Sequence, residues 1–429
     1  MCCVLLNIAY GLTIFWEATP VTQHIVIVGA GECGGRAALS LRERGFAGLL
    51  SLIGSEALAP YERPPLSKDA IVLEAEPKVV AEADRYASLA IDLRLGVSAT
   101  GIDRGHRRVV LSDGAFVSYD KLLLATGARP RELPTIPSPS ERVRTLRSHA
   151  DAMAIRSYLG PGRKMAIIGG GFIGLELAAS ARRLGTSVTL IEGLPRILSR
   201  GVPPEIAEIV ASRHQAEGVD ILCNARIVGI NETGSIVRVL LEDGFAIEAD
   251  IVVVGIGSIP NIEIAAKAGL AVDNGIAVDT HLLTSDPDIY AAGDCCSFPS
   301  DHYGGRRIRL ESWRSAQEQA LLAAANMMGE TEALSAVPWF WSDQYDLTMQ
   351  VAGLAEGAVT TVRRDLSGEA FILFHLATDG RLLAASGIGP GNAIARDIRL
   401  AEMLIGAGRH PDPKALATPE IKLKQLLAA

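Results

Sequence analysis

Two glycine-rich motifs carry the most specific chemistry in this sequence. The first is Gly29-x-Gly31-x-x-Gly34 and the second is Gly169-x-Gly171-x-x-Gly174. Each follows a short apolar run and precedes a helical pattern, so its glycines permit a tight turn and a close approach of the backbone to a pyrophosphate. The N-terminus of the following helix stabilises the negative charge of that pyrophosphate. The sequence therefore predicts two dinucleotide-binding sites.

An acidic residue after the second motif indicates which dinucleotide binds there. Glu192 follows the run SVTLI, where a carboxylate accepts hydrogen bonds from a ribose diol and repels a 2'-phosphate. This favours NADH over NADPH at the second site. In the first unit the corresponding strand ends at Ser55 and Glu56, so the acid is either shifted to Glu56 or replaced by Ser55. A solvated carboxylate at a strand end remains the alternative for both glutamates.

The cysteines and histidines give no sign of a metal or dithiol centre. None of the six cysteines shows the i, i+3 spacing of a redox dithiol or zinc site, and no HExxH motif occurs among the eight histidines. We expect no metal site. Cys295 and Cys296 are interpreted as two small buried residues at a helix start.

The elements that position these motifs indicate two doubly wound α/β domains. Residues 24–45 and 164–185 each combine an apolar strand, a glycine turn and a helix, and each is followed by a second strand. This is the start of a βαβ unit in a parallel sheet. The stretches 107–120 and 238–250 alternate around a DG turn and predict hairpins. After about residue 328, alternating strands and one helix predict a C-terminal α+β domain.

Composition narrows the class of partner. The chain has 429 residues and a formal net charge of −8, which disfavours binding to a nucleic-acid backbone. Residues 1–21 form an apolar N-terminal extension without the basic start of a signal peptide, and its apolar run is too short to cross a bilayer. We expect no stable membrane insertion and a cytoplasmic location, with a membrane tether as the alternative for this segment.

Several further segments occur in one order: PYERPPLSK (60–68), LLLATGARPR (122–131), VGIGSIPN (254–261), YAAGDC (290–295), ESWRSAQEQA (311–320) and PWFWSDQYD (338–346). With the glycine motifs, this order resembles the family of FAD-dependent, NADH-using ferredoxin reductases that serve Rieske-type aromatic-ring dioxygenases and bacterial P450 systems. The resemblance implies a glutathione-reductase-like fold. It also implies FAD and NADH as cofactors, a [2Fe-2S] ferredoxin as partner and a role in aromatic hydrocarbon catabolism.

The resemblance also implies domain boundaries and site residues. An FAD-binding domain would comprise 22–130 and 258–328, an NAD-binding domain 131–257, and the α+β domain 329–429. Lys68 and Glu176 would form the catalytic pair beside the flavin. The residues implied for FAD are Gly29, Gly31, Cys33, Gly34, Glu56, Lys68, Ala99, Arg144, Asp294 and Trp313. The residues implied for NAD are Gly169, Gly171, Gly174, Glu192 and Gly257.

Redox chemistry is consistent with this resemblance, because a flavin accepts two electrons from NADH and releases them singly to an iron–sulfur protein. Two alternatives stay open: a thiol-dependent NADH peroxidase or disulfide reductase, and an FAD-bound signalling protein resembling apoptosis-inducing factor. The first lacks a cysteine beside PPLSK, and the second is disfavoured by the net charge. The basic cluster of Arg306, Arg307 and Arg309 is a candidate docking surface for an acidic ferredoxin, with a solvated face as its alternative.

Overall fold

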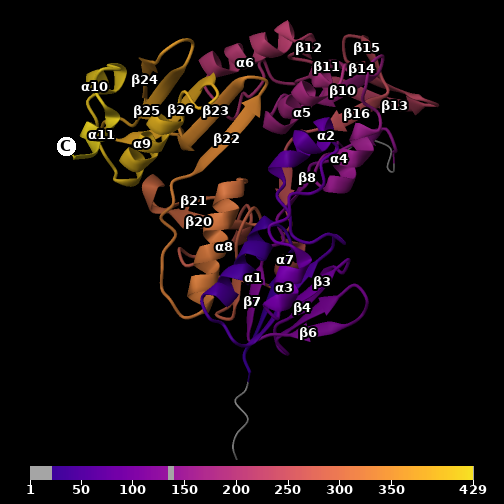
Figure 1. Ribbon diagram of the computed structural model, residues 1–429, viewed down its shortest axis with the longest axis vertical. Coiled ribbons are helices and arrows are strands. Elements are labelled where there is room, and N and C mark those ends of the chain that lie inside the picture. Colours follow the sequence, from indigo (N-terminus) through magenta and orange to yellow (C-terminus); the bar gives the residue numbers. More distant parts are fainter. Residues whose placement is uncertain (1–21, 134–139, 429) are drawn as a thin grey trace, which may run out of the picture.

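The computed structural model describes residues 22–133 and 140–428 and shows three lobes (Figure 1). The predicted N-terminal extension, residues 1–21, lies outside the described residues. The first lobe, at the bottom of Figure 1, and the second, at the upper right, each contain a parallel sheet. The third lobe, at the upper left, is built on an antiparallel sheet. Among the described residues, no helix combines the length and the apolar character that a membrane span needs.

The first lobe joins two separate stretches of chain in one sheet. Its parallel strands have the spatial order β19 (Ile289–Ala291), β7 (Lys121–Leu124), β1 (His24–Val28), β2 (Leu49–Gly54) and β3 (Asp92–Leu95). Helices α1 (Glu32–Glu43) and α8 (Trp313–Met327) pack against each other beside it. Strands β1 and β7 are almost wholly buried, as their continuous apolar runs predict for a sheet covered on both faces.

Smaller elements complete this lobe. They are α3 (Ala83–Ser88), the meander β4 (Ala99–Asp103), β5 (Arg108–Leu111) and β6 (Phe116–Ser118), α7 (Glu263–Lys267), β18 (Ile276–Ala277), β20 (Cys296–Ser300), η2 (Asp301–Tyr303) and β21 (Arg306–Ile308). The short elements η1 (Pro64–Ser67) and α2 (Asp69–Val72) lie between β2 and α3 in the sequence but pack against the second lobe (Figure 1). The hairpin predicted in 107–120 is β5 and β6. An antiparallel pair of β8 (Ala128–Pro130) and β17 (Ser258–Pro260) lies where the chain leaves and re-enters the lobe.

The second lobe repeats the first one's plan. Its sheet has the order β12 (Val219–Leu222), β11 (Ser187–Ile191), β10 (Lys164–Ile168), β16 (Ile251–Val254) and β9 (Val143–Arg144), with every pairing parallel. Helices α4 (His149–Arg156), α5 (Phe172–Arg183) and α6 (Pro204–Ala216) belong to it, as does the meander β13 (Ile227–Thr233), β14 (Ile236–Leu241) and β15 (Ala246–Ala249). The hairpin predicted in 238–250 is β14 and β15.

The third lobe is an antiparallel sheet with helices. Its strand order is β22 (Trp339–Gln344), β23 (Leu347–Gly353), β26 (Leu382–Pro390), β25 (Phe371–Leu376) and β24 (Thr360–Asp365). Helices α9 (Ala395–Gly406), α10 (Pro413–Ala417) and α11 (Leu423–Ala428) accompany it. Met349, Val351 and Phe371 of this sheet belong to the same buried cluster as Leu175 of α5. The second and third lobes therefore share a core, and the predicted fold class is confirmed.

Candidate cofactor site

The first glycine turn connects β1 to α1. Gly29 has φ +113°, and a Cβ there would lie 2.0 Å from the carbonyl oxygen of Ala125. A Cβ at Gly34 would lie 1.8 Å from the carbonyl oxygen of Gly29, so only glycine lets the helix pack on the turn. An added Cβ at Gly31 would meet nothing within 4 Å. This open side at a helix N-terminus leaves room for an anionic ligand.

The second turn, between β10 and α5, has the same design. Gly169 has φ +107°, and a Cβ there would lie 2.4 Å from the carbonyl oxygen of Gly255. A Cβ at Gly174 would lie 2.4 Å from the carbonyl oxygen of Gly169, whereas Gly171 has open space. Repetition of the same close contacts shows that the two motifs form the same kind of turn.

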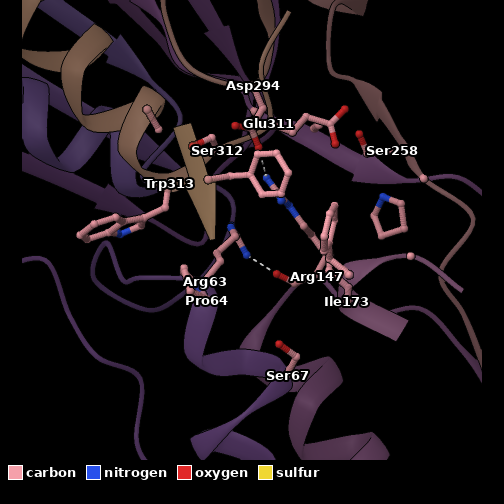
Figure 2. A pocket seen from close by; sticks show the side chains of 18 of the residues that line it. Arg63, Pro64, Ser67, Arg147, Ile173, Ser258, Asp294, Glu311, Ser312 and Trp313 are labelled. Atoms are coloured by element: carbon pink, nitrogen blue, oxygen red, sulfur yellow. Dashed lines mark hydrogen bonds and ion pairs between the residues drawn. The ribbon is translucent and has the colours of Figure 1, made fainter. Parts of the chain in front are cut away.

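One continuous cavity of about 1180 Å³ joins the two turns. Figure 2 shows part of its lining, in which Arg63, Ser67, Arg147, Asp294 and Trp313 surround a common space. Of the predicted site residues, those lining the cavity are Gly29, Gly31, Cys33, Glu56, Lys68, Asp294, Trp313, Gly171, Gly174, Glu176 and Gly257. Those outside its lining are Gly34, Ala99, Arg144, Gly169 and Glu192. Gly34 and Gly169 instead shape the turns.

Lys68 and Glu176 form the expected ion pair inside this cavity. Lys68 Nζ lies 3.1 Å from Glu176 Oε1, and the two side chains are 25% and 9% exposed. Lys68 lies between η1 and α2, and Glu176 lies on α5, so the pair fixes this short segment of the N-terminal part of the chain to the second lobe. Two hydroxyls, of Ser67 and Ser342, also donate to the carboxylate. No sequence motif pointed to these two serines.

Arg147 takes the place at the cavity that the sequence suggested for Arg144. Arg147 Nη2 lies 3.1 Å from Asp294 Oδ2, whereas Arg144 Nε donates to the carbonyl of Glu141. Burial raises the pKa of Asp294, and the neighbouring Arg147 opposes that rise. Arg144 is the last residue of the short strand β9, whereas Arg147 lies in the loop that follows this strand and reaches Asp294 of the first lobe. Ala99 lies on the peripheral meander, away from the cavity.

Glu56 is held at the first turn by two further residues. Tyr61 donates a hydrogen bond of 2.6 Å to Glu56 Oε2, and Arg63 Nη2 lies 2.7 Å from Oε1. Burial raises the pKa of Tyr61 to about 12, so its hydroxyl keeps its proton. Arg63 also donates to the carbonyl of Arg147. Arg63, which sequence reasoning missed, thus connects Glu56 to the loop that supplies Arg147.

Glu192 lies at the end of β11 beside the second turn. Its Oε2 accepts a hydrogen bond of 2.7 Å from the amide of Gly170, and its Oε1 accepts one of 2.8 Å from the amide of Leu194. Each carboxylate oxygen has a second lone pair, so the side chain retains acceptor capacity for a ribose hydroxyl. Its role as a ribose ligand remains a prediction.

The cysteines of the described residues are free. Cys33, Cys295 and Cys296 are buried, and burial raises the pKa of all three thiols. The expected burial of Cys295 and Cys296 is confirmed, but their placement at a helix start is wrong. Cys296 begins strand β20 instead, in which Pro299 lacks the amide hydrogen that a helix would require.

Three tryptophans form a cluster beside the cavity. Trp313 lies edge-on to Trp341 with ring centroids 5.7 Å apart, and Trp341 stacks on Trp339 at 5.4 Å. Trp313 Nε1 is buried and has no hydrogen-bond partner within the described ranges, as is also true of Ser258 Oγ (Figure 2). Both residues line the cavity, so two unpaired donors are buried in or behind its wall.

These features fit FAD. The open side of Gly31 suits a pyrophosphate, Glu56 suits a ribose, and the Lys68 ammonium at the cavity wall suits a polar ring system. The fold and this cavity define a two-dinucleotide flavoprotein oxidoreductase.

Comparison with known proteins gives the family. The family model described as pyridine nucleotide-disulphide oxidoreductase matches residues 23–320, and the model described as reductase C-terminal matches residues 339–427. The chain belongs to this oxidoreductase family and, within it, to the FAD-dependent ferredoxin–NAD(+) reductases. FAD and NAD(H) are therefore its cofactors.

The similarity extends over nearly the whole chain. The ferredoxin–NAD(+) reductase component of the anthranilate 1,2-dioxygenase system of Burkholderia cepacia is 41% identical, covering 94% of this chain and 98% of that protein. Putidaredoxin reductase of Pseudomonas putida is 38% identical over 95% of this chain and 97% of its own length. The crystal structure of the covalent putidaredoxin reductase–putidaredoxin complex matches with a TM-score of 0.89 at 36% identity, covering 95% of this chain and 98% of that one.

Proposed function

We propose that this protein takes electrons from NADH and passes them through FAD to a small [2Fe-2S] ferredoxin that supplies an aromatic-ring dioxygenase or a P450. The observation that carries the proposal is the single cavity that joins both dinucleotide turns at Lys68 and Glu176. When bound, FAD supplies the conversion of a two-electron hydride transfer into one-electron steps. The named relatives serve dioxygenase systems and putidaredoxin, which supports this class of partner.

The chain's own residues prepare that cavity. The Lys68 ammonium supplies positive charge where a reduced ring would carry negative charge. Glu176 balances this ammonium, so the pair is buried without an uncompensated charge. Arg147 does the same for Asp294. The N-termini of α1 and α5 would present backbone amides to the pyrophosphates of the two dinucleotides.

We further infer the domain boundaries given above: 22–130 with 258–328 for FAD, 131–257 for NAD and 329–429 for the C-terminal domain. Strand β19, which completes the sheet of β1 and β7, supports the discontinuous FAD domain. Site residues follow this division. Gly29, Gly31, Cys33, Glu56, Asp294 and Trp313 would contact FAD together with Arg63 and Arg147, and Gly171, Gly174, Glu192 and Gly257 would contact NADH. A cytoplasmic location, where thiols stay reduced, is supported by the free cysteines.

The test is anaerobic reduction of acceptors by the FAD-loaded protein. We expect NADH to bleach the flavin, and the reduced protein then to reduce one or more of a set of [2Fe-2S] ferredoxins that includes putidaredoxin. Ferricyanide serves as the control acceptor for the NADH half-reaction. Efficient reduction of a peroxide or disulfide, with none of the ferredoxins reduced, would replace this proposal by the thiol-dependent alternative.

A further inference from the structure

The carboxylate of Glu176 accepts hydrogen bonds from two serine hydroxyls and pairs with the Lys68 ammonium. Ser67 Oγ lies 2.6 Å from Oε2, whereas Ser342 Oγ at 2.6 Å and Lys68 Nζ at 3.1 Å share Oε1. Ser67 lies on η1 at the cavity wall (Figure 2), and Ser342 lies on β22 of the third lobe. Glu176 is 8% exposed. Its orientation is therefore set by its neighbours rather than by water.

Two further polar side chains, of Gln344 and His214, extend the hydrogen-bonded chain beyond Ser342. Gln344 Nε2 donates to Ser342 Oγ at 3.2 Å, and His214 Nε2 lies 2.8 Å from Gln344 Oε1. Ser342, Gln344 and His214 are 1%, 3% and 0% exposed. The chain of hydrogen bonds thus runs from α6, through β22, to the carboxylate at the cavity.

The partners fix the direction of every bond in this chain. An ionised carboxylate only accepts, so the Ser342 hydroxyl must donate to Glu176. The oxygen of Ser342 then accepts from the Gln344 amide nitrogen, which turns the amide oxygen toward His214. His214 Nε2 must therefore carry a hydrogen. All donors point toward the carboxylate, an arrangement in which each hydrogen bond polarises the next.

Packing alone does not account for these residues. Ser342 and Gln344 lie two apart on β22 and occupy its buried face, where an apolar residue would pack at lower cost. Burial lowers the pKa of His214, so its ring stays neutral and adds no charge to the interior. A buried, fully connected set of polar groups costs stability unless every member is satisfied, and here each group has its partner.

We propose that Ser342, Gln344 and His214 are positioning residues that hold the Glu176 carboxylate and, through it, the Lys68 ammonium at the cavity, so that the third lobe tunes the potential of the flavin. This inference rests on the proposed function in placing FAD in this cavity. Without the Ser342 donor, the carboxylate charge is less neutralised and draws Lys68 more strongly. Added electrons on the flavin are then less stabilised, so its midpoint potential falls.

The test compares Ser342→Ala and Gln344→Leu with Ser297→Ala. Ser297 is a matched control because it is also 1% exposed and its hydroxyl also donates a hydrogen bond of 2.6 Å. Ser297 lies on β20 of the first lobe, and its acceptor is the backbone carbonyl of Asp273 rather than Glu176. The measurement is the FAD midpoint potential of each folded variant with full FAD content. We expect Ser342→Ala to lower the equilibrium constant for FAD reduction about tenfold, which is a fall of about 30 mV in the midpoint potential of a two-electron couple. Gln344→Leu should lower it less, and Ser297→Ala should leave it unchanged.

A double-mutant cycle separates positioning from general disruption. In a Glu176→Gln background, Ser342→Ala should no longer move the midpoint potential, because the charge that it positions is gone. An unchanged potential in both Ser342→Ala and Gln344→Leu overturns the inference, as does an equal shift in the Glu176→Gln background. Failure of the wild-type protein to bind FAD would instead overturn the proposed function.

Discussion

Arg147 and Asp294 come from different lobes and meet at the cavity, with Arg147 Nη2 at 3.1 Å from Asp294 Oδ2. The Asp294 side chain is 17% exposed, and burial is the main cause of its raised pKa. Arg147 opposes that shift by stabilising the carboxylate. The pair therefore joins the loop before α4 to the turn that follows β19, and it opposes the effect of burial on the pKa of Asp294.

Removing Arg147 should leave Asp294 buried without its counter-charge. We expect Arg147→Gln to lower the unfolding free energy of the apoprotein by about 2 kcal/mol and to weaken FAD retention. Urea unfolding and FAD titration measure the two effects. Arg144→Gln is the matched control, because Arg144 lies three residues earlier and does not line the cavity. Equal effects of the two substitutions would contradict a role for the Arg147–Asp294 pair.

The preference for NADH should depend on Glu192. We expect kcat/KM to favour NADH over NADPH by about a hundredfold, roughly 2.7 kcal/mol. Glu192→Ala should shrink that ratio, mainly by weakening NADH. The same substitution leaves the amides of Gly170 and Leu194 without their acceptor, so thermal unfolding must be measured alongside the kinetics. An unchanged ratio in folded protein means that Glu192 is not the ribose ligand.

These two cases show how far the sequence alone could go. The glycine turns were predictable, because their spacing encodes contacts within a few residues, such as that between Gly34 and Gly29. The Lys68–Glu176 pair needed the family pattern, since its members lie in segments that are far apart in the sequence. Arg147 could not be chosen over Arg144, because which side chain of the loop faces the cavity depends on how the lobes pack. The same holds for Ser342 and Gln344, whose role depends on a contact between β22 and α5.

The cysteines should be dispensable for the NADH half-reaction. Burial raises the pKa of Cys33, Cys295 and Cys296, which disfavours the reactive thiolate at neutral pH. We expect replacement of all six cysteines by serine to leave NADH-dependent ferricyanide reduction largely intact in protein that folds and binds FAD. Loss of this activity despite full FAD content would restore the disulfide-reductase alternative.

His375 should make stability depend on pH. Its side chain is buried on β25, and its Nε2 forms a hydrogen bond of 3.2 Å with Ser386 Oγ. Burial lowers the pKa of His375 from 6.5 to about 4. Between these values the unfolded state binds a proton that the folded state does not, so the unfolding free energy falls as pH drops from 6.5 to about 4. The shift corresponds to a loss of about 3 kcal/mol.

Chemical unfolding across this pH range measures that slope. His375→Gln removes the titrating ring and should flatten the dependence, although the substitution itself costs stability in a packed sheet. His410→Gln is the control, because His410 is exposed and its ring lies within hydrogen-bond distance of the Asp379 carbonyl. The same slope in wild type and His375→Gln would show that other groups cause the pH dependence.

The arginines suggested as a ferredoxin docking surface are engaged within the chain. Arg306 pairs with Glu356, Arg309 pairs with Glu311, and Arg307 donates to the carbonyls of Val278 and Ser297. The Arg309 side chain is only 13% exposed. These contacts favour a structural role, because a docking arginine should keep donors free for its partner.

A structural role makes a different prediction from docking. We expect Arg307→Gln to lower the unfolding free energy by about 2 kcal/mol, because two carbonyls lose a charged donor. Arg306→Gln should change it by less than about 0.5 kcal/mol, because that pair is exposed. The triple change to glutamine should slow ferredoxin and ferricyanide reduction in the same proportion. A selective loss of ferredoxin reduction, with the wild-type rate falling as salt rises, would favour docking instead, because salt screens exposed charges that steer association.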